Sequence, residues 1–140
     1  MSKPRKRETL GYILLTFLVI ILDQGFKFVT SVFFEVVKNQ GVGLGLFSGQ
    51  TFNLVALGFG VLTIILWKNN LSSASALLLG GAVSNLIDRL RFGYVVDYID
   101  ISKVIPGLEF PVFNLADVAI IIGAVLLLRV LLPKAGRKYG

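Results

Sequence analysis

The chain has 140 residues, of which 55% are hydrophobic and 16% are charged, a composition that excludes an ordinary soluble domain and indicates a membrane protein. The absence of cysteine and histidine excludes disulfides, a thiol nucleophile, a Ser-His-Asp triad and any histidine-containing metal site. The net charge of +6 comes mainly from basic residues clustered at both ends beside long apolar runs, so we expect membrane-interface positions and no nucleic-acid binding.

The apolar runs predict four membrane-spanning helices, because each crossing needs about 20 largely apolar residues. The first run follows a basic segment, as in a signal peptide, but no A-x-A-like cleavage site comes after it. We therefore expect an uncleaved first span. The predicted spans are residues 11–32, 51–67, 74–89 and 113–132.

The basic residues at both ends predict that both termini face the cytoplasm, by the positive-inside rule. Two termini on one side require an even number of crossings, which agrees with four. With short connections and no visible linker, residues 1–140 are expected to form a single membrane domain.

The two predicted outer loops differ in character. Residues 33–50 are rich in glycine, whereas residues 92–102 are rich in β-branched and aromatic residues, which favours a short strand. Within the third span, the Gly80-Gly81-Ala82 cluster predicts close approach of a neighbouring helix.

The polar residues that cluster in the spans fall toward the outer side of the membrane, and no comparable cluster exists in the inner half. An ionisable side chain at the bilayer centre costs about 2.5 to 3.5 kcal/mol, so each is a functional candidate. Residues three apart share a helix face, so each asparagine should point with its aspartate. Because the spans alternate in direction, the following residues should converge near the outer surface: Asp23, Lys27, Asn85, Asp88, Asn114 and Asp117, together with the loop residues Asp97 and Asp100.

Paired carboxylates are the natural hydrolytic device for a chain without histidine or cysteine. Two aspartates that lie close together cannot both ionise cheaply, so they share a proton. One form then takes a proton from water while the other donates to the carbonyl oxygen or the leaving amine. The pKa values of such a dyad belong to the pair.

Four sequence blocks carry a resemblance to a known family. They are Leu-Asp-Gln-Gly-Phe-Lys at 22–27, Lys-Asn-Gln-Gly at 38–41 with the residues to 47, Gly-Gly-Ala-Val-Ser-Asn-Leu-Ile-Asp-Arg at 80–89 with Gly-Tyr-Val-Val-Asp-Tyr-Ile-Asp at 93–100, and Phe-Pro-Val-Phe-Asn-Leu-Ala-Asp at 110–117. In these blocks the sequence resembles the lipoprotein signal peptidases, also called signal peptidase II. One departure is Val42-Gly43-Leu44, where the family usually reads Ala-Ala-Phe.

The resemblance implies an all-α membrane protein, a four-helix bundle with a small extracytoplasmic β-cradle and loop. It implies a monomeric aspartyl peptidase of the bacterial plasma membrane, in contact with membrane lipids, with both termini cytoplasmic and no cofactor. The implied substrates are prolipoproteins whose lipobox cysteine carries a diacylglyceryl group. Cleavage would occur just before that cysteine.

By the same resemblance, Asp97 and Asp117 are the catalytic pair. The residues expected to bind substrate or support the site are Asp23, Lys27, Asn39, Gly41, Asn85, Asp88, Arg89 and Asn114.

Simpler interpretations stand beside several of these assignments. Asp23 and Lys27, four residues apart, could form an ion pair and nothing more. The Asp88-Arg89 dipeptide could be structural, and Asp100 a solvated loop acid. Asn39 could serve only as a hydrogen-bond partner for backbone groups in the glycine-rich loop, and Gly41 could serve only to let the chain turn.

Two rival functions use the same residues. A serine-lysine peptidase would take Lys27 as base, but the nearby Ser31 and Ser48 sit in no recognisable nucleophile motif. A small proton-coupled carrier would also place carboxylates in membrane helices, yet it needs a path to the inner side. The polar residues here stop at the outer half.

Overall fold

The computed structural model describes residues 6–42, 47–48, 73–105, 107 and 110–131, and this part of the chain is mostly helical with two short antiparallel strand pairs. The predicted second span, residues 51–67, lies outside the described residues. The elements are α1 (Lys6–Phe33), β1 (Val37–Asn39), β2 (Gly41–Val42), β3 (Phe47–Ser48), α3 (Ser73–Phe92), β4 (Val95–Asp97), the 3-10 helix η1 (Ile101–Lys103) and α4 (Leu115–Leu131).

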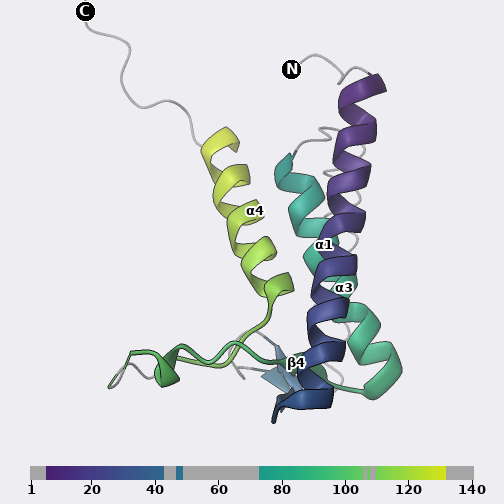
Figure 1. Cartoon of the computed structure of the whole chain (residues 1–140). Helices are drawn as coiled ribbons and strands as arrows, with labels where there is room; N and C mark the ends of the chain where they lie inside the picture. The colour runs from purple at the N-terminus through teal and green to yellow at the C-terminus, as the bar shows by residue number, and fades with distance from the viewer. Residues whose placement is uncertain (1–5, 43–46, 49–72, 106, 108–109, 132–140) are drawn as a thin grey trace, which may run out of the picture.

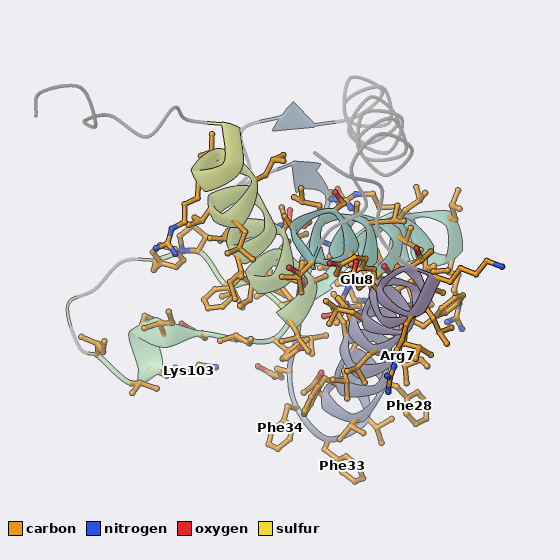
Figure 2. The ribbon with its side chains drawn as sticks, turned by 90° about the horizontal axis from the view of Figure 1, so that it is seen from above. Arg7, Glu8, Phe28, Phe33, Phe34 and Lys103 are labelled. Carbon is orange, nitrogen blue, oxygen red and sulfur yellow. The ribbon has the colours of Figure 1, made fainter. Side chains whose placement is uncertain are left out.

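Helix α1 is apolar on its outside and partly polar on its inside, the reverse of a soluble helix. Its buried residues recur every three or four positions: Thr16, Val19, Asp23 and Lys27. Ile21 and Phe28 are instead 65% and 72% exposed, and Figure 2 shows Phe28 pointing away from the other helices. Among the helices of the described residues, α1 is the one that is both long enough and apolar enough to cross a membrane.

The three described helices lie side by side, with α3 packed against both α1 and α4. Figure 1 shows that α1 and α3 run in one direction and α4 in the other. The start of α1 and the end of α4 therefore lie at one end of the bundle, and β4 lies at the opposite end. The polar residues late in α1 and α3 and early in α4 consequently share the β4 end.

Small residues set the spacing between these helices. A Cβ on Gly80 would lie 2.8 Å from the Val19 Cβ of α1, and one on Gly81 would collide with the Ala116 carbonyl oxygen of α4. The prediction that the Gly80-Gly81 cluster allows close helix approach is confirmed.

The strand expected within residues 92–102 is present but short. It is β4, which pairs antiparallel with β1 so that Asn39 lies opposite Val95 and Val37 opposite Asp97. A second antiparallel pair joins β2 to β3. After β4 the chain forms η1, whose N-cap is Asp100, with its carboxylate accepting a hydrogen bond from the Ser102 N–H at 3.1 Å.

The three described helices begin or end at residues other than the ends of the predicted spans. The first helix begins at Lys6 instead of residue 11, because its basic and acidic first residues are good helix formers. The last helix begins at Leu115 instead of residue 113, because Phe113 forms a β-bridge with Ile99. The third begins at Ser73 and runs to Phe92, three residues beyond the prediction. The count of four helices and the extracytoplasmic position of the strands stay predictions.

Candidate active site

Asp97 is the last residue of β4, and its side chain is 1% exposed. Since Asn39 pairs with Val95 and alternate residues of a strand share a face, Asn39 and Asp97 lie on one face of the strand pair. The Asn39 Nδ2 donates to Asp97 Oδ2 at 2.8 Å, and the Asn114 Nδ2 donates to Asp97 Oδ1 at 2.7 Å. Both carboxyl oxygens therefore accept an amide hydrogen bond.

Burial raises the pKa of Asp97 to about 6 from its ordinary value of 3.8. The hydrogen bond from Asn39 favours the charged form and opposes this rise, whereas the nearby charge of Asp117 adds to it. Asp97 therefore keeps its proton to a higher pH than an ordinary aspartate, as a member of an acid-base pair should.

Asp117 lies in the first turn of α4 and is held there by a reciprocal cap. The Asp117 N–H donates to Asn114 Oδ1 at 2.9 Å, and the Asn114 N–H donates to Asp117 Oδ2 at 3.2 Å. This is the capping-box pattern, with an aspartate in the place of the usual glutamate. Asp117, which the sequence analysis assigned to the catalytic pair, thus also helps to start α4.

Asn85 and Asn114 connect the two carboxyl groups. Asn85 Nδ2 donates to Asp117 Oδ1 at 2.8 Å, just as Asn114 donates to Asp97. Asn114 Nδ2 also lies 3.2 Å from Asn85 Oδ1, so the two amides contact each other. The predicted catalytic pair is therefore joined by a continuous chain of hydrogen bonds through two asparagines.

Lys27 is 3% exposed and lies beside the hydrogen-bonded asparagines, between two carboxylates. Its Nζ is 2.7 Å from Asp23 Oδ2 and 2.9 Å from Asp88 Oδ2, and it donates to Asn85 Oδ1 at 2.9 Å. The Asp23–Lys27 contact is more than an isolated ion pair, because it extends to α3 and to an asparagine that contacts Asp117.

Asp23 reaches across from α1 to the beginning of α4. Its Oδ1 accepts the Ala116 N–H at 2.9 Å and its Oδ2 accepts the Ser84 hydroxyl at 2.7 Å. A carboxylate at a helix N-terminus is favoured by the free N–H groups and the helix dipole there. Asp23 therefore fixes the helix end that carries Asp117.

Three further residues belong to the cluster although the sequence did not single them out. Gln24 Nε2 donates to Asp88 Oδ1 at 2.7 Å and to the Ser84 hydroxyl at 3.1 Å. The hydroxyl of Tyr98 accepts the Leu115 N–H at 3.2 Å. Ser84 lies four residues before Asp88 and so on the same helix face, and this spacing could have predicted that Ser84 belongs to the cluster. The partner of Tyr98 is 17 residues away, and no local pattern indicates it.

The other predicted residues take varied positions. Asp88 Oδ2 accepts the Val96 N–H at 3.0 Å, so Asp88 ties α3 to β4. Arg89 donates to the Asn85 carbonyl at 3.1 Å and interacts electrostatically with both candidate catalytic aspartates. Gly41 lies in β2 opposite Ser48, and its role in the site stays a prediction. Asp100 caps η1, so it belongs to the loop and not to the cluster.

The arrangement suits acid-base chemistry. Within the described residues, no three aspartate or glutamate side chains are grouped as ligands for a metal ion. Asp97 is fully buried whereas Asp117 is partly exposed, so Asp117 is the more accessible member of the pair. The charge of Asp117 helps to raise the pKa of Asp97, so the protonation of one carboxyl group depends on the charge of the other.

The contacts of Lys27 argue against a serine-lysine mechanism. A protonated lysine has three N–H donors, and here they meet Asp23, Asp88 and Asn85. None of these three partners is a serine, so the Lys27 amine is not paired with a hydroxyl nucleophile in the part of the chain that the structure describes. Lys27 is therefore placed as a structural residue that joins α1 to α3.

Comparison with known proteins extends the similarity over nearly the whole chain. A family model described as Signal peptidase (SPase) II matches residues 15–132. The lipoprotein signal peptidase of Moorella thermoacetica is 38% identical over 91% of this chain and 96% of its own, and that of Burkholderia vietnamiensis is 35% identical over 91% of each. A solved structure described as a bacterial membrane enzyme is similar with a TM-score of 0.79 at 29% identity, covering 92% of both chains.

Proposed function

Because the chain belongs to the signal peptidase II family, we propose that it removes signal peptides from diacylglyceryl-modified bacterial prolipoproteins, with Asp97 and Asp117 as the catalytic pair. The observation that carries this proposal is the hydrogen-bonded chain Asp97–Asn114–Asn85–Asp117. It joins two carboxyl groups at the end of the bundle where β4 lies, and burial raises the pKa of Asp97 there.

In the proposed reaction, the ionised member of the pair takes a proton from a water molecule as the water oxygen attacks the scissile carbonyl carbon. The protonated member first donates a hydrogen bond to the carbonyl oxygen. As the C–N bond breaks, a proton passes to the departing amine of the lipidated cysteine, and the water oxygen remains on the new carboxyl terminus. The pair thus begins and ends with one shared proton.

A site at this end of an apolar bundle suits a substrate held in the membrane. The outward face of α1 carries large exposed apolar side chains that match lipid, while its inward face carries Asp23 and Lys27 of the cluster. We propose that the described helices span the bacterial plasma membrane with both termini cytoplasmic and the Asp97–Asp117 pair toward the outer surface. A prolipoprotein anchored by its signal helix and its lipid would then reach the pair by diffusing in the plane of the membrane.

The test is cleavage of a purified diacylglyceryl-modified prolipoprotein by wild type, Asp97→Asn and Asp117→Asn. Asp100→Asn is the matched control, since Asp100 lies three residues from Asp97 but bonds Ser102 of the loop. Loss of an acid-base partner should lower kcat by at least about 100-fold in both dyad variants, with normal cleavage by the control.

Each variant is first checked for a wild-type thermal unfolding profile in detergent. Cleavage at the wild-type rate by either folded dyad variant would show that the catalytic pair is wrongly assigned. A wild-type protein that never cleaves the substrate, yet carries protons across liposomes, would favour the carrier instead.

A further inference from the structure

Lys27 is the buried charged group that the proposed mechanism does not use. We propose that Lys27 is a positioning residue that acts through Asn85, keeping the Asn85 amide turned so that its N–H₂ group faces Asp117. This inference rests on the proposed function, because it assigns a role within the same reaction. It is carried by the direction of the hydrogen bonds at Asn85.

The two ends of the Asn85 amide have different partners. Its Oδ1 accepts from Lys27 Nζ at 2.9 Å and from Asn114 Nδ2 at 3.2 Å. Its Nδ2 donates to Asp117 Oδ1 at 2.8 Å. If the amide turned by half a rotation, its N–H₂ group would face two donors and its oxygen would face a carboxylate. All three contacts would become repulsive, so the observed orientation is strongly determined.

Of the two donors that hold the Asn85 oxygen, Lys27 is the stronger. A hydrogen bond from an ammonium is roughly twice as strong as one from a neutral amide. Asn114 Nδ2 makes its shorter contact, 2.7 Å, with Asp97 and not with Asn85. Lys27 is itself held between Asp23 of α1 and Asp88 of α3, which leaves its third N–H aimed at Asn85.

For the proposed reaction, this arrangement keeps the N–H₂ group of Asn85 fixed beside the carboxyl group of Asp117. Asp117 Oδ1 always meets an N–H of Asn85 and never its carbonyl oxygen, so this oxygen is kept as an acceptor. No proton of the pair is therefore donated from this oxygen to Asn85. Without Lys27, the amide can rotate, and a share of the molecules would present an oxygen to Asp117.

The experiment compares Lys27→Met, Asn85→Ala and the double variant in cleavage of the diacylglyceryl-modified prolipoprotein in detergent micelles. Asn85→Ala should lose about 100-fold in kcat, as for the loss of one positioned donor, with KM changed less than about threefold. Lys27→Met should lose less than Asn85→Ala, because only a share of its molecules would turn the amide. Because both changes remove the same donor, the double variant should be no slower than the slower single. Losses that multiply would overturn the inference.

Lys103→Met is the matched control, because Lys103 is 76% exposed and its ion pair is with Asp100 of the loop. It should cleave at the wild-type rate. Since Lys27→Met leaves two carboxylates without their cation, that variant can fail to fold. A second variant, Asn85→Asp, covers this case: it still accepts a hydrogen bond from Lys27 but offers Asp117 an oxygen in place of the N–H₂ group.

Asn85→Asp should fold like wild type and lose about 100-fold in kcat at nearly unchanged KM. A folded Asn85→Asp variant with wild-type kcat overturns the role of Lys27. If Asp97→Asn and Asp117→Asn are inactive in that same assay, the catalytic pair stands and this inference alone fails. If those two variants cleave normally, the proposed function itself has failed.

Discussion

Asn114 and Asp117 cap each other at the beginning of α4: the Asp117 N–H donates to Asn114 Oδ1 at 2.9 Å, and the Asn114 N–H donates to Asp117 Oδ2 at 3.2 Å. The same Asn114 side chain donates to Asp97 through its Nδ2. One residue therefore starts the helix with its oxygen and bonds the second carboxyl group with its nitrogen.

These two roles of Asn114 can be separated by substitution. Asn114→Ala removes both, so it should lower the free energy of unfolding by about 1 kcal/mol and reduce kcat. Asn114→Ser keeps a capping oxygen but has no amide to donate to Asp97, so it should be nearly as stable as wild type and still lose most of its activity. Thermal unfolding in detergent and cleavage kinetics measure the two effects.

If Asn114→Ser cleaves at the wild-type rate, the bond to Asp97 does not matter to the reaction and Asn114 is a helix cap alone. Equal unfolding temperatures for Asn114→Ala and wild type would instead contradict the capping role.

Much of the site follows from the sequence because membrane burial makes polar residues costly. The alternating direction of the spans placed Asp23, Asn85 and Asp117 at one end, and the contacts of Lys27 with Asp23 and Asn85 agree with that convergence. The three-residue spacing that predicted a shared face for Asn85 and Asp88 is also confirmed, since both contact Lys27.

The remainder could not be read from periodicity. Tyr98 caps Leu115 because the backbone of Phe113 pairs with Ile99, and a pairing of that kind depends on the path of a loop. The hydrogen bond from Gln24 to Asp88 joins residues 64 positions apart on different helices. Hydrophobic patterns give the face that a residue occupies, but they do not give its partner on another element.

The pH dependence of cleavage should respond to Asn39. The proposed mechanism needs one proton on the pair, so activity should fall as pH rises past the pKa of about 6 at Asp97. The Asn39 hydrogen bond favours the charged form, so Asn39→Ala raises the pKa of Asp97 further. The falling limb of kcat should then move to higher pH by about one unit, as expected for loss of one hydrogen bond.

Gln40→Ala is the control for this profile, since Gln40 is exposed and lies one residue after β1. Its pH profile should coincide with that of wild type. A limb that stays in place in Asn39→Ala, or moves to lower pH, would contradict the proposed influence of Asn39 on Asp97.

The hydroxyl of Tyr98 should contribute to stability. It accepts the Leu115 N–H and lies 3.5 Å from Asp23 Oδ1, while burial raises the pKa of Tyr98 and keeps the hydroxyl protonated. Tyr98→Phe leaves the Leu115 N–H without this acceptor and should lower the free energy of unfolding by about 1 kcal/mol. Tyr94→Phe is the matched control, and equal losses in both variants would show that the Leu115 contact adds nothing.

Gly81 should tolerate no side chain, because it lies where α3 meets the beginning of α4. A Cβ there would collide with the Ala116 carbonyl oxygen and lie 2.7 Å from Ile120 Cγ1. The obstacle at Ala116 is backbone next to Asp117, so α4 would have to shift to relieve the collision. Gly81→Ala should therefore lose about 1 to 3 kcal/mol of stability, the usual cost of overpacking, and lose activity as well.

Gly11→Ala is the matched control for this change, since Gly11 also lies within a helix but a Cβ there has nothing within 4 Å. Alanine favours a helix more than glycine does. The free energy of unfolding of Gly11→Ala should therefore equal that of wild type or exceed it by up to about 1 kcal/mol. Thermal unfolding in detergent and cleavage assays should separate the two variants. If Gly81→Ala unfolds at the temperature of Gly11→Ala and cleaves normally, α4 is not held as closely against α3 as the contacts of Gly81 require.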